Sequence, residues 1–193
     1  MIKTTWRLFL LLTIITGCIY PHLITAIAQG CFGWQANGSI ITDQGLAVGS
    51  KWIGQNFYND AYFWGRPSAT LAHPYNGLAS GGSNLGPTNP VLLSTIKSRI
   101  AEHDFSHHPI PVDLITASAS GLDPEISPEA AYYQIPRIAH ARQLSESQIR
   151  ALIESHTQSR TFNILGEPRV NVLNLNLALD TIRPLSPPNV NKP

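Results

Sequence analysis

The chain has 193 residues, a formal net charge of +1 and only 13% charged residues. Because nucleic-acid-binding proteins normally carry a strongly basic surface, this charge balance argues against a DNA- or RNA-binding protein. Fifteen prolines and fourteen glycines predict many turns between short helices and strands.

The first element in chain order is an uncharged apolar run over residues 8–28. As a helix it spans about 31 Å, the thickness of the hydrocarbon core of a bilayer. Lys3 and Arg7 precede the run, and the next charged residue is Asp43. Because Lys and Arg collect on the cytoplasmic side, we expect residues 1–7 in the cytoplasm, a transmembrane helix over 8–28 and the rest outside.

Two other interpretations of this segment stay open. Thr16-Gly17-Cys18 resembles the end of a lipoprotein signal, in which Cys18 is lipidated, and Ala26-Ile27-Ala28 resembles a signal-peptide cleavage site. The apolar run continues past Cys18 and exceeds the roughly 7–15 residues of a signal-peptide core, which favours a retained helix. All three interpretations place the domain on the far side of the membrane.

Polar residues interrupt the apolar run near its centre, at Tyr20-Pro21-His22. Such a group indicates either packing against other membrane helices or a simple kink at the proline. Cys18 and Cys31 lie about 20 Å apart on one helix, which is too far for a disulfide.

After the apolar run, residues 39–42 and 46–48 predict two short strands joined by a turn at Asp43-Gln44-Gly45. The aromatic run 61–64 is also strand-prone, and residues 73–90 are predicted to form a loop.

A helix is then expected after Asn89, a good N-cap that precedes a proline. Leu92, Ile96 and Ile100 recur at every fourth position, which predicts a buried stripe on this helix. Residues 111–116 predict an interior strand.

Capping residues locate the remaining helices. Ser127 is followed by Pro128 and predicts a helix that Pro136 divides into two short segments. Ser145 and Gln148 form a capping-box pattern. The buried face of the helix that follows would comprise Ile149, Leu152 and Ile153.

The last element, residues 170–179, has features of both a strand and a helix, and we favour a helix. The proline-rich tail 184–193 is expected to be disordered. The pattern as a whole predicts an α+β fold: one transmembrane helix and then, over 29–183, a single mixed domain of short strands and several short helices.

A glycine-rich loop leads into the helix after Asn89 and could hold an anion, because glycine lets backbone N–H groups approach a ligand. It lacks the Gly-Lys-Ser/Thr ending of a P-loop. A connecting loop is the simpler interpretation. The candidate nucleotide-binding residues are Ser80, Gly81, Gly82, Ser83, Asn84 and Gly86.

Other candidate chemistry is weaker. The stretch Glu102–His108 is rich in histidine but lacks a recognised metal-ligand spacing, so no metal site is expected. Ser120 lies in a small-residue turn that fails the pattern of a hydrolase nucleophile, and nothing assigns His140 or His156 as its base. Its hydroxyl is expected to bond to local backbone instead.

Several motifs, taken together and in this order, resemble the KdpC family, the C subunit of the Kdp potassium-transporting P-type ATPase. The resemblance runs from the apolar helix to about Asp180 and excludes only the tail and the stretch 103–108. The motifs that carry it are Tyr20-Pro21, Phe63–Ser68, Tyr75–Gly77, Ser80–Asn89, Val112–Pro124, Ile126–Pro128, Gln134–Ala139, His156-Thr157, Leu165–Leu173 and Asn176–Asp180.

The resemblance implies a non-hydrolytic accessory subunit of a bacterial inner-membrane complex that imports potassium at the expense of ATP. Its implied partners are the potassium-channel-like subunit, the ATP-hydrolysing subunit and a small single-helix subunit. The family is described as an assembly factor and as a catalytic chaperone that raises the ATP affinity of the ATPase subunit. No cofactor would be tightly bound, and ATP would be held in a ternary complex with that subunit.

Partner contacts are a second expectation that follows from the motifs. The candidate residues for such contacts are Tyr20, Pro21, Arg66, Asp123, Glu167, Arg169 and Asn171. The alternative is a membrane-anchored or lipidated extracytoplasmic hydrolase, which would be active by itself and would need no partner.

Overall fold

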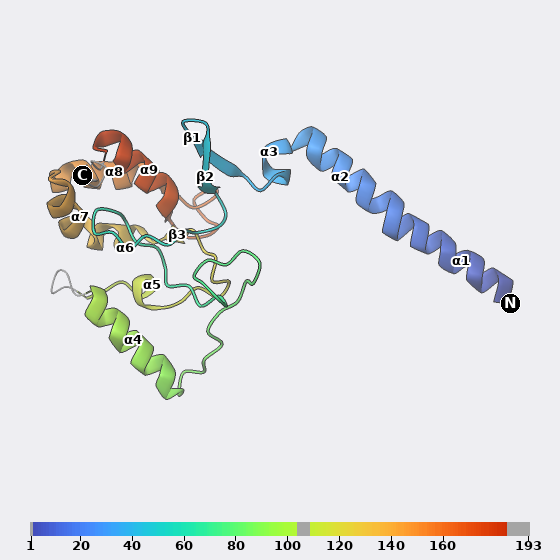
Figure 1. Cartoon of the computed structure of the whole chain (residues 1–193), viewed down its shortest axis with the longest axis horizontal. Coiled ribbons are helices and arrows are strands. Elements are labelled where there is room, and N and C mark those ends of the chain that lie inside the picture. The colour runs from blue at the N-terminus through green and yellow to red at the C-terminus, as the bar shows by residue number, and fades with distance from the viewer. Residues whose placement is uncertain (1, 104–108, 185–193) are drawn as a thin grey trace, which may run out of the picture. The chain divides into compact units, whose positions relative to one another are not determined.

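The computed structural model describes residues 2–103 and 109–184 (Figure 1). The chain forms two compact units, Met1–Ser50 and Lys51–Pro193. A mixed set of helices and short strands follows one long N-terminal helix, which confirms the predicted fold class.

The N-terminal helix consists of α1 (Ile2–Ile14), a π-helical turn η1 (Ile15–Ile19) and α2 (Tyr20–Cys31). The continuous helix has 30 residues, and its most apolar window has a mean hydropathy of 1.9 and no buried residue. Length and composition therefore suit it to cross a membrane. Cys18 and Cys31 are both free thiols.

The π-helical turn precedes Pro21 and has a direct cause in that residue. Proline has no backbone N–H, and its ring cannot pack against the carbonyl four residues earlier, so the helix widens there. The imidazole Nδ1 of His22 lies 2.7 Å from the carbonyl oxygen of Cys18, and Thr16 donates its hydroxyl to the Leu12 carbonyl. Both side chains thus contact carbonyls of their own helix, while Tyr20 is 62% exposed.

The first unit continues with a short helix α3 (Gly33–Ala36) and an antiparallel hairpin of β1 (Ile40–Asp43) and β2 (Leu46–Ser50). Gln44 between the strands has a positive φ of 48°. The hairpin confirms the two strands and the turn predicted from the sequence.

The second unit contains a small sheet and several helices. Its sheet has the antiparallel order β3 (Glu125–Ile126), β5 (Arg169–Asn171) and β4 (Thr157–Gln158). The helices are α4 (Pro90–His103), α5 (Val112–Ile115), α6 (Pro128–Tyr133), α7 (Ile135–Arg142), α8 (Glu146–His156) and α9 (Val172–Ile182).

The hydrophobic core lies among α6 to α9 and the sheet, where α8 packs on α6, α7 and α9. Its largest fully buried apolar side chains are Phe63, Leu114, Ile126, Ile135, Ile138, Ile149, Ile153, Val170, Leu175 and Leu179. Helix α4 packs on α5 and lies apart from α7 to α9 in Figure 1. The predicted buried stripe on α4 is wrong, because Leu92 and Ile96 are only half-buried and Ile100 is 41% exposed. The one-turn helix α5 is too short to cover them.

The predicted helix caps are confirmed. The hydroxyl of Ser127 accepts the Ala130 N–H at the start of α6, and Ser145 and Gln148 form a reciprocal capping box on α8. A new helix begins at Ile135, so the division expected at Pro136 is also present.

Two predicted strands are wrong. Residues 61–64 form irregular backbone, and residues 112–115 form the helix α5. In α5 the carboxylate of Asp113 accepts the Ser127 N–H at 2.7 Å, and Leu114 is fully buried. One helical turn achieves both, whereas a strand would point these neighbours to opposite faces.

The ambiguous segment 170–179 is a strand followed by a helix. Val170 and Asn171 belong to β5, and the preferred helix begins at Val172. The change occurs at Asn171, whose side chain accepts the Asn174 N–H as an N-cap. Beyond Pro184, the predicted disordered tail lies outside the described residues, as does most of the histidine-rich stretch.

Candidate functional site

The most specific polar arrangement holds the irregular segment Asn59–Trp64. The side-chain amide of Asn176 on α9 accepts the Phe63 N–H at 2.8 Å and donates to the Phe63 carbonyl at 3.0 Å. The amide of Gln134 does the same for Trp64, at 2.8 and 3.1 Å. Both amides are buried. We call Gln134 and Asn176 the amide clamp, because together they give consecutive residues the backbone hydrogen bonds that a neighbouring strand would supply.

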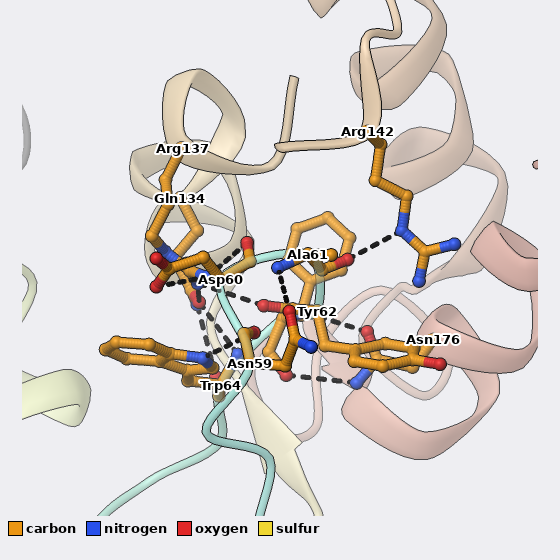
Figure 2. Close-up of polar contacts among 10 residues, drawn as sticks. Asn59, Asp60, Ala61, Tyr62, Trp64, Gln134, Arg137, Arg142 and Asn176 are labelled. Atoms are coloured by element: carbon orange, nitrogen blue, oxygen red, sulfur yellow. Dashed lines mark hydrogen bonds and ion pairs between the residues drawn. The ribbon is translucent and has the colours of Figure 1, made fainter. Parts of the chain in front are cut away.

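Two arginines extend the clamp along the same segment (Figure 2). Arg137 donates to the carbonyls of Asp60 and Tyr62 at 2.6 and 3.0 Å. Arg142 donates to the carbonyl of Ala61 at 2.7 Å. Burial lowers the pKa of the Arg137 guanidinium to about 10, with the nearby carboxylate of Asp60 acting in the opposite direction. Arg137 therefore stays charged at neutral pH.

The same arginines also stack on the aromatic rings of the segment. The guanidinium of Arg137 lies 4.1 Å from the centre of the Trp64 ring, and that of Arg142 lies 4.7 Å from the Tyr62 ring. Arg142 pairs with Asp180 at 2.8 Å, and the Tyr62 hydroxyl donates to the same carboxylate at 2.9 Å. Helices α7 and α9 thus hold both the backbone and the side chains of the segment.

The clamped segment continues into Gly65-Arg66-Pro67-Ser68, which is fixed by Tyr75. The hydroxyl of Tyr75 donates to the carbonyl of Arg66. A Cβ atom on Gly54 would lie 2.4 Å from the Tyr75 ring, and one on Gly65 would lie 2.7 Å from its hydroxyl. Only glycine at both positions leaves room for this ring.

Burial raises the pKa of the Tyr75 phenol to about 12, and the nearby carboxylate of Asp123 raises it further in the same direction. The ring is therefore neutral throughout the physiological range. Its hydroxyl acts as a fixed hydrogen-bond donor to the motif.

A pocket of about 390 Å³ opens beside this motif. Its lining includes the stretch Trp64–Ser68 and, from α4, Arg99 and Glu102. The aromatic residues Phe57 and Tyr58 and the ring of Pro74 complete the lining. We call it the Arg66 pocket.

The predicted partner-contact charges in the domain form separate ion pairs. Arg66 pairs with Asp123 at 3.1 Å, Arg169 pairs with Glu125 at 2.9 Å, and Glu167 pairs with Arg160. The three other predicted residues form no ion pair within the described part of the chain. Asn171 caps α9 and donates to the carbonyl of Lys51 at 3.0 Å. Tyr20 and Pro21 lie on α2 in the other unit. Their contact role stays a prediction.

The glycine-rich loop packs against the turn 118–121. The N–H of Gly81 and the hydroxyl of Ser80 both donate to the Ser120 carbonyl, at 2.9 and 3.0 Å. A Cβ atom on Gly82 would lie 2.9 Å from the carbonyl oxygen of Ala119. The glycines therefore permit close packing of two backbones. Ser83, Asn84 and Gly86 follow in the exposed part of the loop, where a nucleotide role stays a prediction.

The other candidate chemistry reduces to local bonding. The hydroxyl of Ser120 accepts the Leu122 N–H at 3.1 Å, as expected for a turn. The Nδ1 atom of His156 lies within hydrogen-bond distance of the Leu152 carbonyl and the Ser155 hydroxyl, both on its own helix. Over residues 2–103 and 109–184, no group of three His, Cys, Asp or Glu side chains could hold a metal ion.

The sequence analysis missed the amide clamp and the α4 wall of the pocket. Asn176 lies between the core residues Leu175 and Leu179, and this polar residue in an apolar helix was the available signal. Gln134 lies two residues before Pro136, and in the sequence it stands out only as part of the motif Gln134–Ala139. Nothing in the sequence connects Arg99 with Arg66.

Comparison with known proteins shows similarity over nearly the whole chain. The family model described as the K+-transporting ATPase, c chain, matches residues 2–181. The potassium-transporting ATPase KdpC subunit of Paraburkholderia phytofirmans is 57% identical over 181 residues, covering 91% of this chain and 94% of the relative. The chain belongs to the KdpC family.

Other KdpC subunits show the same level of similarity. That of Polynucleobacter asymbioticus is 56% identical over 177 residues, with 90% of this chain and 94% of the relative covered. That of Herpetosiphon aurantiacus is 55% identical over 180 residues, with 91% and 93% covered. The family resemblance inferred from the motifs is confirmed, and it includes both the apolar helix and the domain.

The clamp of this KdpC-family domain predicts a large effect of Asn176→Leu. The substitution leaves the N–H and the carbonyl of Phe63 unpaired, at about 1–3 kcal/mol per buried group, so we expect a loss of about 2–6 kcal/mol in the free energy of unfolding. Urea unfolding of the detergent-solubilised chain measures it. The control is Asn174→Leu on the same helix, with an expected change of about 0.5 kcal/mol. Equal urea midpoints for the two variants would contradict the clamp.

The pKa of Tyr75 predicts a specific alkaline destabilisation. In the unfolded chain the phenol ionises near pH 10, whereas the folded protein holds the proton until about pH 12. The stabilisation by Tyr75 is therefore complete below pH 10 and is lost between pH 10 and 12. Tyr75→Phe should flatten the decline of the urea midpoint over this interval. Tyr58→Phe, at a ring that is 76% exposed, should retain it, and identical curves for both variants refute the prediction.

Proposed function

We propose that the chain is a non-hydrolytic accessory subunit of a potassium-transporting ATPase. The observation that carries the proposal is the family match over residues 2–181, together with relatives that are named as KdpC subunits of that ATPase. The match includes the apolar helix as well as the domain. Both parts therefore belong to the function that the relatives share.

The apolar helix supports a membrane-bound role. Its most apolar stretch has no buried residue, so these apolar side chains need lipid or other membrane helices around them. Lys3 and Arg7 lie near its N-terminal end, and the next charge along the chain is Asp43. By the positive-inside rule, the proposed orientation has the N-terminus in the cytoplasm and the domain outside.

We place the domain at the extracytoplasmic mouth of the channel-like subunit. The helix would pack on that subunit, and the ATP-hydrolysing and small single-helix subunits would complete the assembly. A docking role is compatible with the domain's polar chemistry, since Gln134, Arg137 and Asn176 bond to its own backbone. This rigid construction suits a binding module that keeps its shape on association.

Any effect of the chain on ATP would be indirect in this arrangement. Cytosolic ATP and an extracytoplasmic domain are on opposite sides of the membrane, so a higher ATP affinity would pass through the membrane-spanning subunits. The glycine-rich loop supports an indirect effect, because Ser80 and Gly81 donate to the Ser120 carbonyl and so hold the loop against the domain's own backbone. The catalytic-chaperone description then refers to a conformational influence on the ATPase subunit.

One experiment tests both the partner and the orientation. A C-terminally tagged Cys18→Ser chain leaves Cys31 as its remaining cysteine, and intact cells are treated with a membrane-impermeant thiol reagent before affinity purification. We expect labelled Cys31 and co-purification of a P-type ATPase with its channel-like subunit.

Two outcomes of this experiment would contradict the proposal in different ways. Labelling of Cys31 only after lysis, in a chain purified without its partners, would reverse the orientation. Purification of the chain without an ATPase would refute the accessory role.

Removal of residues 51–193 behind an intact helix should reduce potassium uptake, and normal uptake would show that the domain is not needed at the channel mouth.

A further inference from the structure

The Arg66 pocket is lined by two guanidinium groups whose hydrogen-bonding capacity is only partly filled by the described residues. Arg66 forms one ion pair, with Asp123 at 3.1 Å, and its Nε atom is buried without a hydrogen-bond partner among the described residues. Arg99 donates from Nη1 to the Ile115 carbonyl at 3.0 Å, the one hydrogen bond described for its side chain. A guanidinium has five N–H donors in a planar fork, so both groups can bind a further oxyanion.

The rest of the lining is typical of a protein-binding surface. Phe57, Tyr58 and Trp64 lie beside the arginines, and Tyr, Trp and Arg are the residue types enriched at energetic hot spots of protein interfaces. The volume of about 390 Å³ is at the lower end of the range for ligand pockets, which is about 300–1,000 Å³. A single side chain and its neighbours would fill it.

The pocket wall is also preformed. The amide clamp bonds both backbone groups of Phe63 and Trp64, and Tyr75 holds the carbonyl of Arg66. A binding residue that is already ordered loses less conformational entropy on association. The clamp thus keeps the side chains of Trp64 and Arg66 in place before a partner arrives.

We propose that the Arg66 pocket binds an acidic side chain, Asp or Glu, on a polypeptide segment of another subunit of the ATPase. The carboxylate lies between the guanidinium groups of Arg66 and Arg99, and its apolar neighbours in the partner segment pack on Tyr58 and Trp64. This site rests on the proposed function, because the segment belongs to a subunit of the same complex. Opposite charge supplies the specificity, and the aromatic rings supply apolar contact.

Glu102 makes the proposal testable, because its substitution should change the affinity in the opposite direction from a substitution of Arg99. Its side chain lines the same pocket and accepts a hydrogen bond from Ser98 at 3.4 Å. A carboxylate at this position repels an incoming carboxylate. Glu102→Gln should therefore strengthen the association, whereas the loss of Arg99 should weaken it.

The test measures the Kd of the detergent-solubilised full chain for the complex of the other subunits. Arg99→Gln should weaken binding about tenfold, and Glu102→Gln should strengthen it about twofold to fivefold. Higher ionic strength should weaken the wild-type complex more than the Arg99→Gln complex. The matched control is Arg150→Gln on α8, an arginine over the ring of Tyr132, which should bind like the wild-type chain.

Arg99 also ties α4 to α5, so the circular dichroism and the urea midpoint of Arg99→Gln are recorded beside its affinity. The Glu102→Gln variant keeps the test valid if Arg99→Gln unfolds, because the Glu102 side chain is exposed. Unchanged affinity in both variants, or weaker binding in both, refutes an acidic ligand.

Calorimetric titration of the free chain with acetate, phosphate and Mg·ATP separates a free anion from a partner side chain. Submillimolar binding that Arg99→Gln abolishes would assign the pocket to a free anion and overturn the proposal. Failure of the wild-type chain to bind the other subunits would instead refute the proposed function. The two failures are thus distinguishable.

Discussion

The domain depends on two buried amides that pair with consecutive backbone residues. Asn176 bonds both the N–H and the carbonyl of Phe63, and Gln134 bonds both groups of Trp64. Phe63 is fully buried, so its backbone has no water to bond with. A buried peptide group without a partner is costly, and the amides remove that cost without a neighbouring strand.

This pairing connects the core to the surface. Gln134 joins α6 to α7, and Asn176 lies on α9, so the packing of these helices determines where residues 59–64 lie. The segment then leads directly to Arg66, which lines the pocket. In a KdpC-family protein, whose proposed role is to bind other subunits, a change in the helix core would therefore alter the contact surface.

The sequence predicts best where the determinants are local. The hairpin, the capping box at Ser145 and the helix start at Ser127 depend on neighbouring residues, and all are present. The apolar run over 8–28 lies within the long helix Ile2–Cys31. Family motifs identified the chain because their order along it is itself specific.

Prediction fails where the deciding contact is distant. Residues 61–64 have strand-like composition, but their partners are side chains 70 and 113 positions away. Residues 111–116 are helical in part because Asp113 reaches Ser127. Arg66 and the α4 residues Arg99 and Glu102 line the same pocket. Their spacing in the sequence does not predict this proximity. The glycine-rich loop suggested a ligand, whereas Gly82 closely approaches Ala119.

Hydrogen–deuterium exchange at the backbone amides of Phe63 and Trp64 measures the clamp most directly. Both N–H groups belong to irregular backbone yet donate to buried side-chain oxygens. We therefore expect them to exchange as slowly as the amide of the fully buried strand residue Val170. Exchange as fast as that of the loop residue Leu71, which is 77% exposed, would show that the amides do not hold the segment.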